Sequence, residues 1–388
     1  MNNQNMRTAQ SCVADTRQAV AEFHAGVTQP GMELVLFFCS SEYDLEILAA
    51  EMNRLFAGVQ VVGCTTAGEI GPSGYCNHSL SGVSFAEGCC TAVSRRLDDL
   101  SRFAIAQGHD FAQALLQQLE SKAPDSSPDN SFALLLIDGM SVREEPVAHA
   151  LQHALGKITL FGGSAGDDQK FAKTYVFSEG GFHSDSAVLV LVSTSLPFKI
   201  FKTQHFVTTD QRLVVTEADP SRRMVKEING LPAAEEYARL LGIDAHELNS
   251  ASFAASPVVV MIDGTDYVRS IQRANADGSL TFFCAIEEGL VLRVAHGVAL
   301  VNNLEQTFDD VHAEIGQPQL VIACDCILRN LEVIQNGLKD RVAEIFRNNN
   351  AVGFNSYGEQ FHGVHVNQTL TGIAIGSTPK SPQEPRDA

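Results

Sequence analysis

Short apolar runs alternate with helix-length amphipathic stretches in three parts of the chain. The three parts are 32–38, 44–56 and 59–63; 132–139, 144–155 and 158–163; and 318–325, 330–348 and 351–356. A short apolar run is typical of a buried strand, and apolar residues spaced three or four apart are typical of a helix face. We therefore predict strand–helix–strand segments within an α/β fold of layered, mixed sheets.

Other apolar runs follow one another without a helix between them. The segments "KTYVFSEG" (173–180) and "SDSAVLVLVS" (184–193) predict antiparallel strands. After a junction near 210–220, "VKEINGLP" predicts a strand and turn, and "AAEEYARLLG" predicts a helix that ends at Gly242. The expected division is a partly disordered N-terminal segment (1–29), two domains (30–215 and 216–376) and a disordered tail (377–388).

One sequence phrase occurs twice. Residues 62–85, "VGCTTAGEIGPSGYCNHSLSGVSF", align without gaps with residues 352–375, "VGFNSYGEQFHGVHVNQTLTGIAI". The shared glycines, five positions apart, predict a tight turn from strand to loop. The glycine-rich "FGGSAGDDQ" (161–169) is a weaker third relative of the same turn. Because Phe354 stands opposite Cys64 in the alignment, Cys64 is interpreted as a small buried thiol.

Charge and composition restrict the function classes. The chain has 27 basic and 46 acidic residues and a net charge of −19, which disfavours nucleic acid and anionic membranes as partners. The polar N-terminus lacks a signal-peptide pattern, so a cytoplasmic location is expected. Nine cysteines, an odd number, fit free thiols.

Five phrases together resemble a known family. In chain order, "VVGCTTAGEI", "LFGGSAGDDQKF", "DCILRN", "VGFNSYGEQF" and "HVNQTLTG" resemble the signatures of FIST proteins, and "EINGLPAAEEYARLLG" resembles the opening of a FIST C domain. The resemblance covers roughly residues 30–376 and implies FIST N and FIST C domains that sense a ligand without being an enzyme. A FIST protein of this length without an output domain is similar to the bacterial nitric-oxide-sensing haemoproteins called NosP. That likeness implies b-type haem, a partner histidine kinase in a two-component system, and control of cyclic-di-GMP and biofilm behaviour.

A haem sensor needs an axial ligand, commonly a neutral histidine. His365 stands where the first copy of the repeat has Tyr75, so it is the candidate ligand of the haem iron, and His362 lies nearby. Cys326 is a second candidate, because a strand end followed by a helix would lower the pKa of its thiol. Gly353 and Glu359 belong to the repeated turn and are expected to line the cofactor pocket.

Three other functions stay open at this point. One is a module that binds an amino-acid-like metabolite between the repeats, without haem. Another is an iron–sulfur sensor built from Cys64, Cys76, Cys89 and Cys90, whose spacing matches no familiar pattern. The third is an enzyme that uses Cys64 or Cys326 as a nucleophile. The sequence leaves a homo-oligomer open and does not reveal the surface that a kinase would contact.

Overall fold

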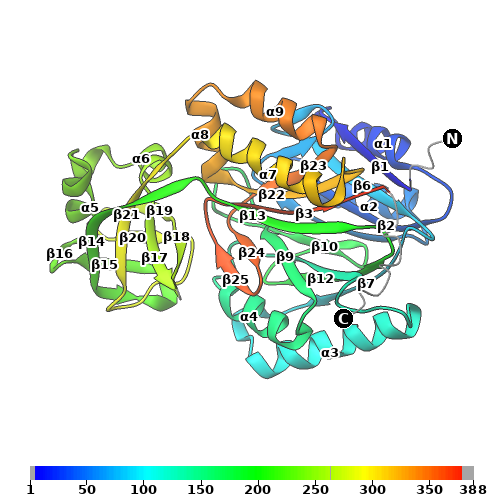
Figure 1. Ribbon diagram of the computed structural model, residues 1–388, viewed down its shortest axis with the longest axis horizontal. Helices are drawn as coiled ribbons and strands as arrows, with labels where there is room; N and C mark the ends of the chain where they lie inside the picture. The colour runs from blue at the N-terminus through cyan, green and yellow to red at the C-terminus, as the bar shows by residue number, and fades with distance from the viewer. Residues whose placement is uncertain (1–4, 263, 378–388) are drawn as a thin grey trace, which may run out of the picture.

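The computed structural model describes residues 5–262 and 264–377. Three units follow one another along the chain and share one order of elements, namely strand, helix, strand, helix, strand, hairpin, strand (Figure 1). The first unit contains β1 (Met6–Ser11), α1 (Thr16–Val27), β2 (Met32–Ser40), α2 (Leu45–Leu55), β3 (Gln60–Thr66), β4 (Glu69–Gly71), β5 (Gly74–Cys76) and β6 (Leu80–Ala86).

The second unit repeats this order between residues 90 and 194. It contains β7 (Cys90–Leu97), α3 (Ile105–Lys122), β8 (Ser131–Ile137), α4 (Glu144–Leu155), β9 (Thr159–Ser164), β10 (Val176–Ser178), β11 (Gly181–His183) and β12 (Ala187–Thr194). The apolar segments expected to form antiparallel strands are β10 and β12, and β12 does pair antiparallel with β7 and β8.

The third unit is interrupted by an inserted module. The unit contains β13 (Phe198–Thr203), α7 (Leu300–Ile315), β22 (Leu320–Cys326), α8 (Ile327–Gln335), α9 (Lys339–Asn348), β23 (Ala351–Ser356), β24 (Glu359–Phe361), β25 (Val364–Val366) and β26 (Leu370–Ile375). The inserted module contains β14 (Phe206–Asp219), β15 (Met224–Ile228), β16 (Leu231–Pro232), α5 (Ala233–Leu241), α6 (Ser250–Ala255), β17 (Val258–Ile262), β18 (Thr265–Arg269), β19 (Ile271–Ala274), β20 (Leu280–Phe282) and β21 (Val291–Gly297).

Each unit gives its hairpin to a neighbouring unit. The central strands of a unit pair in parallel, as β2 with β3, β8 with β9 and β22 with β23. The hairpin strand that follows then pairs antiparallel with a central strand of another unit, as β4 with β23, β24 with β9 and β10 with β3. The exchange is cyclic, so the three units interlock around a common centre.

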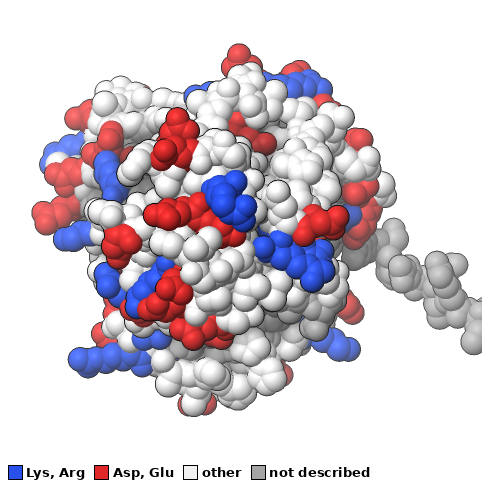
Figure 2. All heavy atoms as spheres, turned by 90° about the vertical axis from the view of Figure 1, so that its left-hand side faces the viewer, with Lys and Arg blue, Asp and Glu red and all other residues white. Residues whose placement is uncertain are grey.

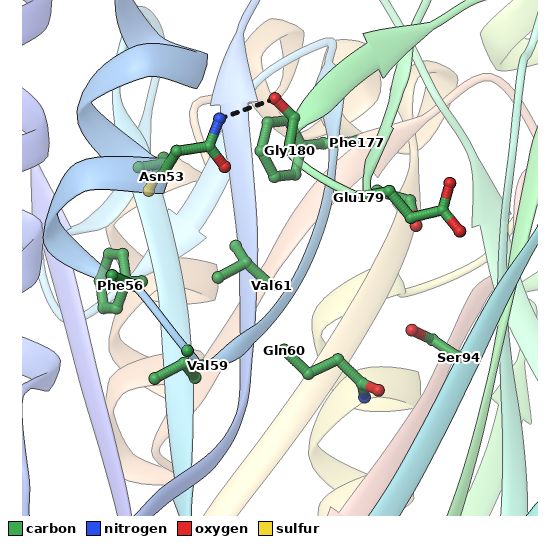
Figure 3. Close-up of a pocket in the computed structure, with 13 residues that line it drawn as sticks. Asn53, Phe56, Val59, Gln60, Val61, Ser94, Phe177, Glu179 and Gly180 are labelled. Atoms are coloured by element: carbon green, nitrogen blue, oxygen red, sulfur yellow. Dashed lines mark hydrogen bonds between the residues drawn. The ribbon is translucent and has the colours of Figure 1, made fainter.

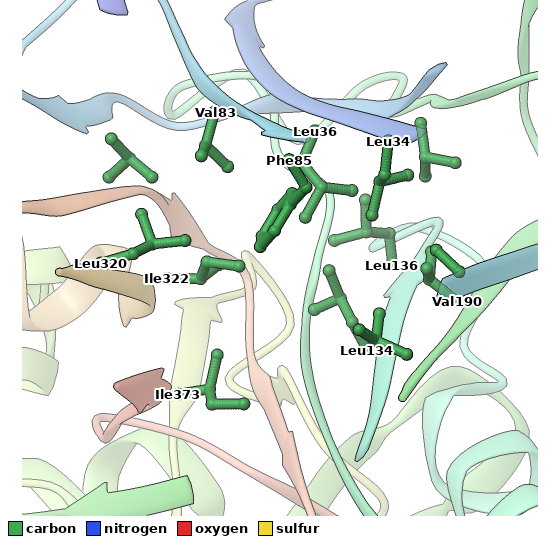
Figure 4. Packing of buried hydrophobic residues seen from close by; sticks show 14 of the residues in the cluster. Leu34, Leu36, Val83, Phe85, Leu134, Leu136, Val190, Leu320, Ile322 and Ile373 are labelled. Atoms are coloured by element: carbon green, nitrogen blue, oxygen red, sulfur yellow. The ribbon is translucent and has the colours of Figure 1, made fainter. Parts of the chain in front are cut away.

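The core lies where the inner faces of the three unit sheets meet (Figure 4). Alternate residues of a strand point to opposite faces, so Leu34, Leu36 and Phe38 of β2 face this centre. Val35 and Phe37 face outward and pack under α1 and α2. Burial on both faces explains why these strands are continuous apolar runs in the sequence. At the centre, the rings of Phe38 and Phe354 stack with centroids 4.7 Å apart.

The N-terminal segment contains a strand and a helix. Residues 1–4 lie outside the described part, but the rest of 1–29 forms β1 and α1. β1 pairs with β6, and α1 buries Val20 and Phe23 against the sheet. The disordered tail expected at 377–388 lies, apart from Ser377, outside the described residues.

The inserted module has a core of its own and stands to one side of the three units (Figure 1). Helix α5 ends at Gly242, which has a left-handed φ of 72°, as the sequence predicted. The expected domain junction near 210–220 falls inside the long strand β14. Figure 2 faces the module and shows acidic and basic side chains interspersed, so the net charge is not gathered in one patch on this face. Among the described residues, no helix is both long and apolar enough to cross a membrane.

Candidate functional site

The repeated turns of the three units meet in a ring of main-chain hydrogen bonds. Each turn donates the equivalent N–H to a carbonyl of another unit, and these bonds are Ala67 N to Asn355 O (2.9 Å), Gly166 N to Thr65 O (2.9 Å) and Tyr357 N to Ser164 O (3.2 Å). The weaker third relative at 161–169 therefore takes the same place in the fold as the two clear copies. The repeated turns therefore join the three units through main-chain hydrogen bonds.

A glycine before each turn allows the central strands to approach closely. A methyl group on Gly353 would stand 1.9 Å from the carbonyl oxygen of Ala323 on the neighbouring strand. Gly63 and Gly162 have the same relation to Phe37 O (2.5 Å) and Leu135 O (1.9 Å). Gly353, predicted to line a cofactor pocket, is thus placed at a contact between strands.

Glu359 and its counterpart Glu69 are buried in matching environments. The Glu359 carboxyl accepts hydrogen bonds from the main-chain N–H (3.2 Å) and hydroxyl (2.6 Å) of Thr369, and Glu69 accepts the same pair from Ser79 (2.9 and 2.7 Å). Burial raises the pKa of each carboxyl to about 8. Each carboxyl therefore holds its own turn together, as weighed from the sequence, and lines neither of the two cavities described below.

The second oxygen of each carboxyl accepts a hydrogen bond from a hydroxyl of the same turn. Glu69 Oε1 contacts the Thr66 hydroxyl, and that hydroxyl also reaches the carbonyl of Cys39 at 3.2 Å. The Thr66 hydroxyl donates to the carboxyl, and this hydrogen bond lowers the pKa of Glu69 by less than burial raises it. Ser356 stands between Glu359 and the carbonyl of Asp325 in the same way. The two glutamates therefore have equivalent hydrogen bonds, and burial is the dominant influence on the pKa of each carboxyl.

His365 is buried on β25 with one ring nitrogen unpartnered. Its Nδ1 lies 3.1 Å from the side-chain amide nitrogen of Gln360, and its Nε2 has no hydrogen-bond partner. Burial lowers the pKa of His365 to about 4, so the imidazole is neutral at pH 7. A methyl group on Gly358 would lie 2.3 Å from the imidazole Cε1. The ring therefore lies directly against the main chain of the repeated turn.

His362 and Cys326 lie elsewhere. His362 is exposed in the turn between β24 and β25, where its ring packs on that of Phe361. Cys326 does precede helix α8, as expected, but its thiol is buried and burial raises its pKa well above the ordinary value. The expected lowering of the pKa by the helix N-terminus is therefore wrong, because desolvation outweighs it. The buried thiol of Cys64 also has a raised pKa, which disfavours a thiolate nucleophile there.

Charged side chains fix the inserted module to the second unit. Arg223 of the module lies 2.6 Å from Glu144 at the start of α4, and it also contacts Glu145. The main-chain N–H of Ala285 donates to Glu145. Arg269 donates to the carbonyl of His365 at 3.3 Å, so the module also covers the third unit's hairpin.

The module fills the place beside the third unit's turn. Ser270 N donates to the Asn367 side chain at 3.3 Å, and the side-chain amide of Gln368 donates to the carbonyl of Ala254 at 2.8 Å. Asn77 and His78 hold the corresponding positions in the first unit, and His78 has the same left-handed φ as Gln368, 55° against 49°. Beside Asn77 and His78 there is instead a cavity of about 300 Å³, the central cavity.

The central cavity is lined by all three units, and its wall combines both charges with amides and an apolar side. Its lining residues are Glu42, Ala67, Asn77, His78, Asp168, Gln169, Lys170, Ile327, Asn330, Leu331 and Ile334. Lys170 Nζ lies 3.4 Å from Glu42 and 3.8 Å from Asp168. The Asn330 amide donates to the Asn355 side chain at 3.0 Å, but its carbonyl oxygen is buried without a partner. Sequence reasoning missed these residues because they come from separate units.

A second cavity of about 540 Å³ lies between α2 and the hairpin β10–β11 (Figure 3). Phe56, Val59 and Phe177 form its apolar part, and Asn53 donates to the carbonyl of Gly180 at 2.8 Å. The Asn53 amide is thus engaged with the main chain, whereas the side-chain nitrogen of Gln60, which also lines this cavity, is buried without a partner.

This chain is similar to a protein family, to a protein from another organism and to solved structures. Residues 33–231 match the FIST N domain and residues 233–362 match the FIST C domain. The chain belongs to the FIST family. An uncharacterized protein of Methanocaldococcus jannaschii is 23% identical to this FIST protein over 368 residues, which cover 83% of this chain and 70% of that protein.

Two solved structures have a low similarity to this FIST protein. Cyanuric acid hydrolase from A. caulinodans aligns with a TM-score of 0.36 and 10% identity over 96% of this chain and 99% of the hydrolase. Another cyanuric acid hydrolase structure aligns with a TM-score of 0.33 and 9% identity over 76% of this chain and 99% of its own. These TM-scores support no inference about activity. FIST domains are sensory modules, so the family indicates a role in signal transduction.

The residues around His365 do not fit a haem. The neutral imidazole suits an axial ligand, but the polar side chains of Gln360, Asn367 and Arg269 surround it, and the main chain of Gly358 lies against the ring. Neither cavity described above is lined by His365, His362 or Cys326. Within residues 5–262 and 264–377, moreover, no group of three or more His, Cys, Asp or Glu side chains is arranged to hold a metal ion.

Proposed function

We propose that this protein is a sensory module that binds a small zwitterionic metabolite, of the size and chemistry of an amino acid, in the central cavity. The observation that carries the proposal is the unpartnered carbonyl oxygen of Asn330 in a wall built from all three units. A buried acceptor without a partner costs free energy, and a ligand that donates a hydrogen bond to it recovers that cost.

The charges around the cavity match a zwitterion. Glu42 and Asp168 supply negative charge for an ammonium group, and the Asn330 oxygen supplies a neutral acceptor on the same wall. Lys170, whose side chain is half exposed, supplies the cation for a carboxylate. Ile327 and Leu331 of α8 provide apolar contact for a side chain. A volume of about 300 Å³ is at the lower end for ligand pockets, which favours a small metabolite.

A ligand bound in the central cavity is connected through Asn330 to the ring of main-chain hydrogen bonds between the units. Asn330 holds Asn355, and the main-chain carbonyl of Asn355 accepts the hydrogen bond from Ala67 that joins the third unit to the first. A ligand that engages Asn330 therefore acts on the contact between units. If the units have two arrangements, the ligand shifts the balance toward the one it binds better, and a partner protein can detect that shift.

A thermal-shift screen with the twenty standard amino acids tests the proposal. We expect one or a few to raise the melting temperature in a concentration-dependent way, because a ligand at about 100 times its Kd stabilises the folded state by about 2.7 kcal/mol. The Asn330→Ala and Lys170→Met variants should lose the shift. Asn53→Ala, in the cavity of Figure 3, is the matched control and should keep it. A panel without any shift, or a shift unchanged in Asn330→Ala, would contradict the proposal.

Haem binding, nitric oxide sensing and regulation of a histidine kinase stay predictions from the family resemblance. The only feature in their favour among the described residues is the neutral, unpartnered imidazole of His365. The iron–sulfur alternative likewise gains nothing from the positions of the four cysteines weighed for it. The small-metabolite function is therefore the one that the geometry supports best.

A further inference from the structure

Two cysteines far apart in the sequence lie side by side at the edge of the first unit. Cys12 directly follows β1, and Cys76 ends β5, and their sulfur atoms are 2.9 Å apart. Cys12 is exposed and Cys76 is partly exposed, whereas each of the other seven cysteines is buried. An oxidant in solution can therefore reach this pair before the others.

The neighbours of the pair connect it to the central cavity by two routes. Cys76 is followed directly by Asn77 and His78, which line the cavity. On the other side, the carbonyl of Val13, next to Cys12, accepts a 2.8 Å hydrogen bond from the Tyr43 hydroxyl. The Tyr43 ring packs edge-on against the ring of His78 at 4.8 Å. Both thiols thus flank one wall of the cavity.

We propose that Cys12 and Cys76 form a reversible disulfide under peroxide and that this bond restrains the Asn77–His78 wall of the central cavity. One thiol attacks the peroxide oxygen to give a sulfenic acid and water, and the second thiol displaces the hydroxyl as a second water. The two thiols together lose two electrons and two protons, and one hydrogen peroxide is reduced to two waters. A thiol such as glutathione reverses the bond by exchange.

The local chemistry sets the speed of this reaction. Burial and the neighbouring Cys76 raise the pKa of Cys12 to about 12. Because the thiolate is the reactive form, the pair responds to sustained oxidant and not to a brief trace. The regulatory consequence rests on the proposed function, since it concerns the same cavity, but formation of the bond does not.

Peptide mapping tests the bond independently of any ligand. Cleavage after glutamate gives fragments 1–22 and 70–87, each with a single cysteine, Cys12 or Cys76. After hydrogen peroxide and blocking of free thiols, we expect these fragments to be linked, with a mass two hydrogens below their sum. Dithiothreitol should release them. Cys12→Ser should abolish the link, and Cys89→Ser, the matched control, should keep it. Fragments that stay unlinked, or a link to another cysteine, would overturn the proposal.

Hydrogen–deuterium exchange tests the effect on the cavity wall. We expect the main-chain amide hydrogens of residues 74–79 to exchange several-fold more slowly in the oxidised protein than in the reduced protein. In Cys12→Ser, the same treatment should leave the exchange rate of this segment unchanged. A linked pair with unchanged exchange in this segment would refute the regulatory part of the proposal. Neither measurement uses an amino acid, so failure here is distinct from failure of the proposed ligand.

Discussion

Replacing Glu359 with glutamine should change how the stability of the protein depends on pH. The pKa of Glu359 is raised from the ordinary 4.5 to about 8 by burial. In the unfolded chain the same carboxyl releases its proton near the ordinary value. Between these two pKa values the folded state holds a proton that the unfolded state has lost, so stability falls as pH rises.

The size of this loss follows from the shift. Each pKa unit corresponds to about 1.4 kcal/mol, so Glu359 costs on the order of 3 kcal/mol of stability between about pH 5 and pH 7.5. The stability that the neutral carboxyl of Glu359 contributes is fully present below the pKa of the unfolded chain. It is lost as the pH rises toward the folded-state pKa of about 8. Glutamine has nearly the same shape, stays neutral and can still hydrogen-bond Ser356 and Thr369. Glu359→Gln should therefore lose less stability than wild type over this range.

Urea unfolding at several pH values measures the effect. The chain has no tryptophan, so far-ultraviolet circular dichroism is the suitable signal. The difference in unfolding free energy between Glu359→Gln and wild type should grow in favour of the variant as pH rises. Glu69→Gln should behave alike because its environment matches, and Glu120→Gln on the exposed face of α3 is the control. If the free energy of unfolding depended on pH in the same way for Glu359→Gln and wild type, the conclusion that the buried carboxyl is neutral would be refuted.

Three further substitutions have definite expected outcomes. Gly353→Ala should destabilise the protein by about 1–3 kcal/mol in the same urea assay, because its methyl group collides with Ala323 O, and an unchanged midpoint would contradict the close approach. Arg223→Met should destabilise by about 3–5 kcal/mol, because Glu144 and Glu145 lose their buried cation, and full stability would show that the ion pair is dispensable. Haem titration should give the same visible spectrum for wild type and His365→Ala, and a stoichiometric Soret band lost only in the variant would establish His365 as an axial ligand.

Local sequence patterns predicted the strands and helices, but they did not predict that each unit pairs its hairpin with a strand of another unit. The apolar runs at 32–38 and 59–63 are β2 and β3, because burial on both faces leaves a continuous signal in the sequence. The pairing of β4 with β23 joins segments of different units, and no local periodicity encodes such a pair. α1 was missed because its apolar face is evident only once β1 and β6 supply the sheet beneath it.

The candidate site was predicted in part, for a similar reason. The repeat located the turns correctly, and their glutamates do bind the main chain of their own turns. His365 was expected at a pocket because it replaces Tyr75, yet the inserted module covers that turn through Arg269 and leaves the first unit's turn open. Asn330 carries no motif, and only its unpartnered oxygen in the folded structure indicates a ligand.

Calorimetric titration of the amino acid that gives the largest thermal shift tests the central claim most directly. The account predicts saturable binding of one molecule per chain to wild type and to Asn53→Ala, with loss of binding in Asn330→Ala. Binding that persists in Asn330→Ala, or that is lost in Asn53→Ala alone, would place the ligand outside the central cavity and contradict the account.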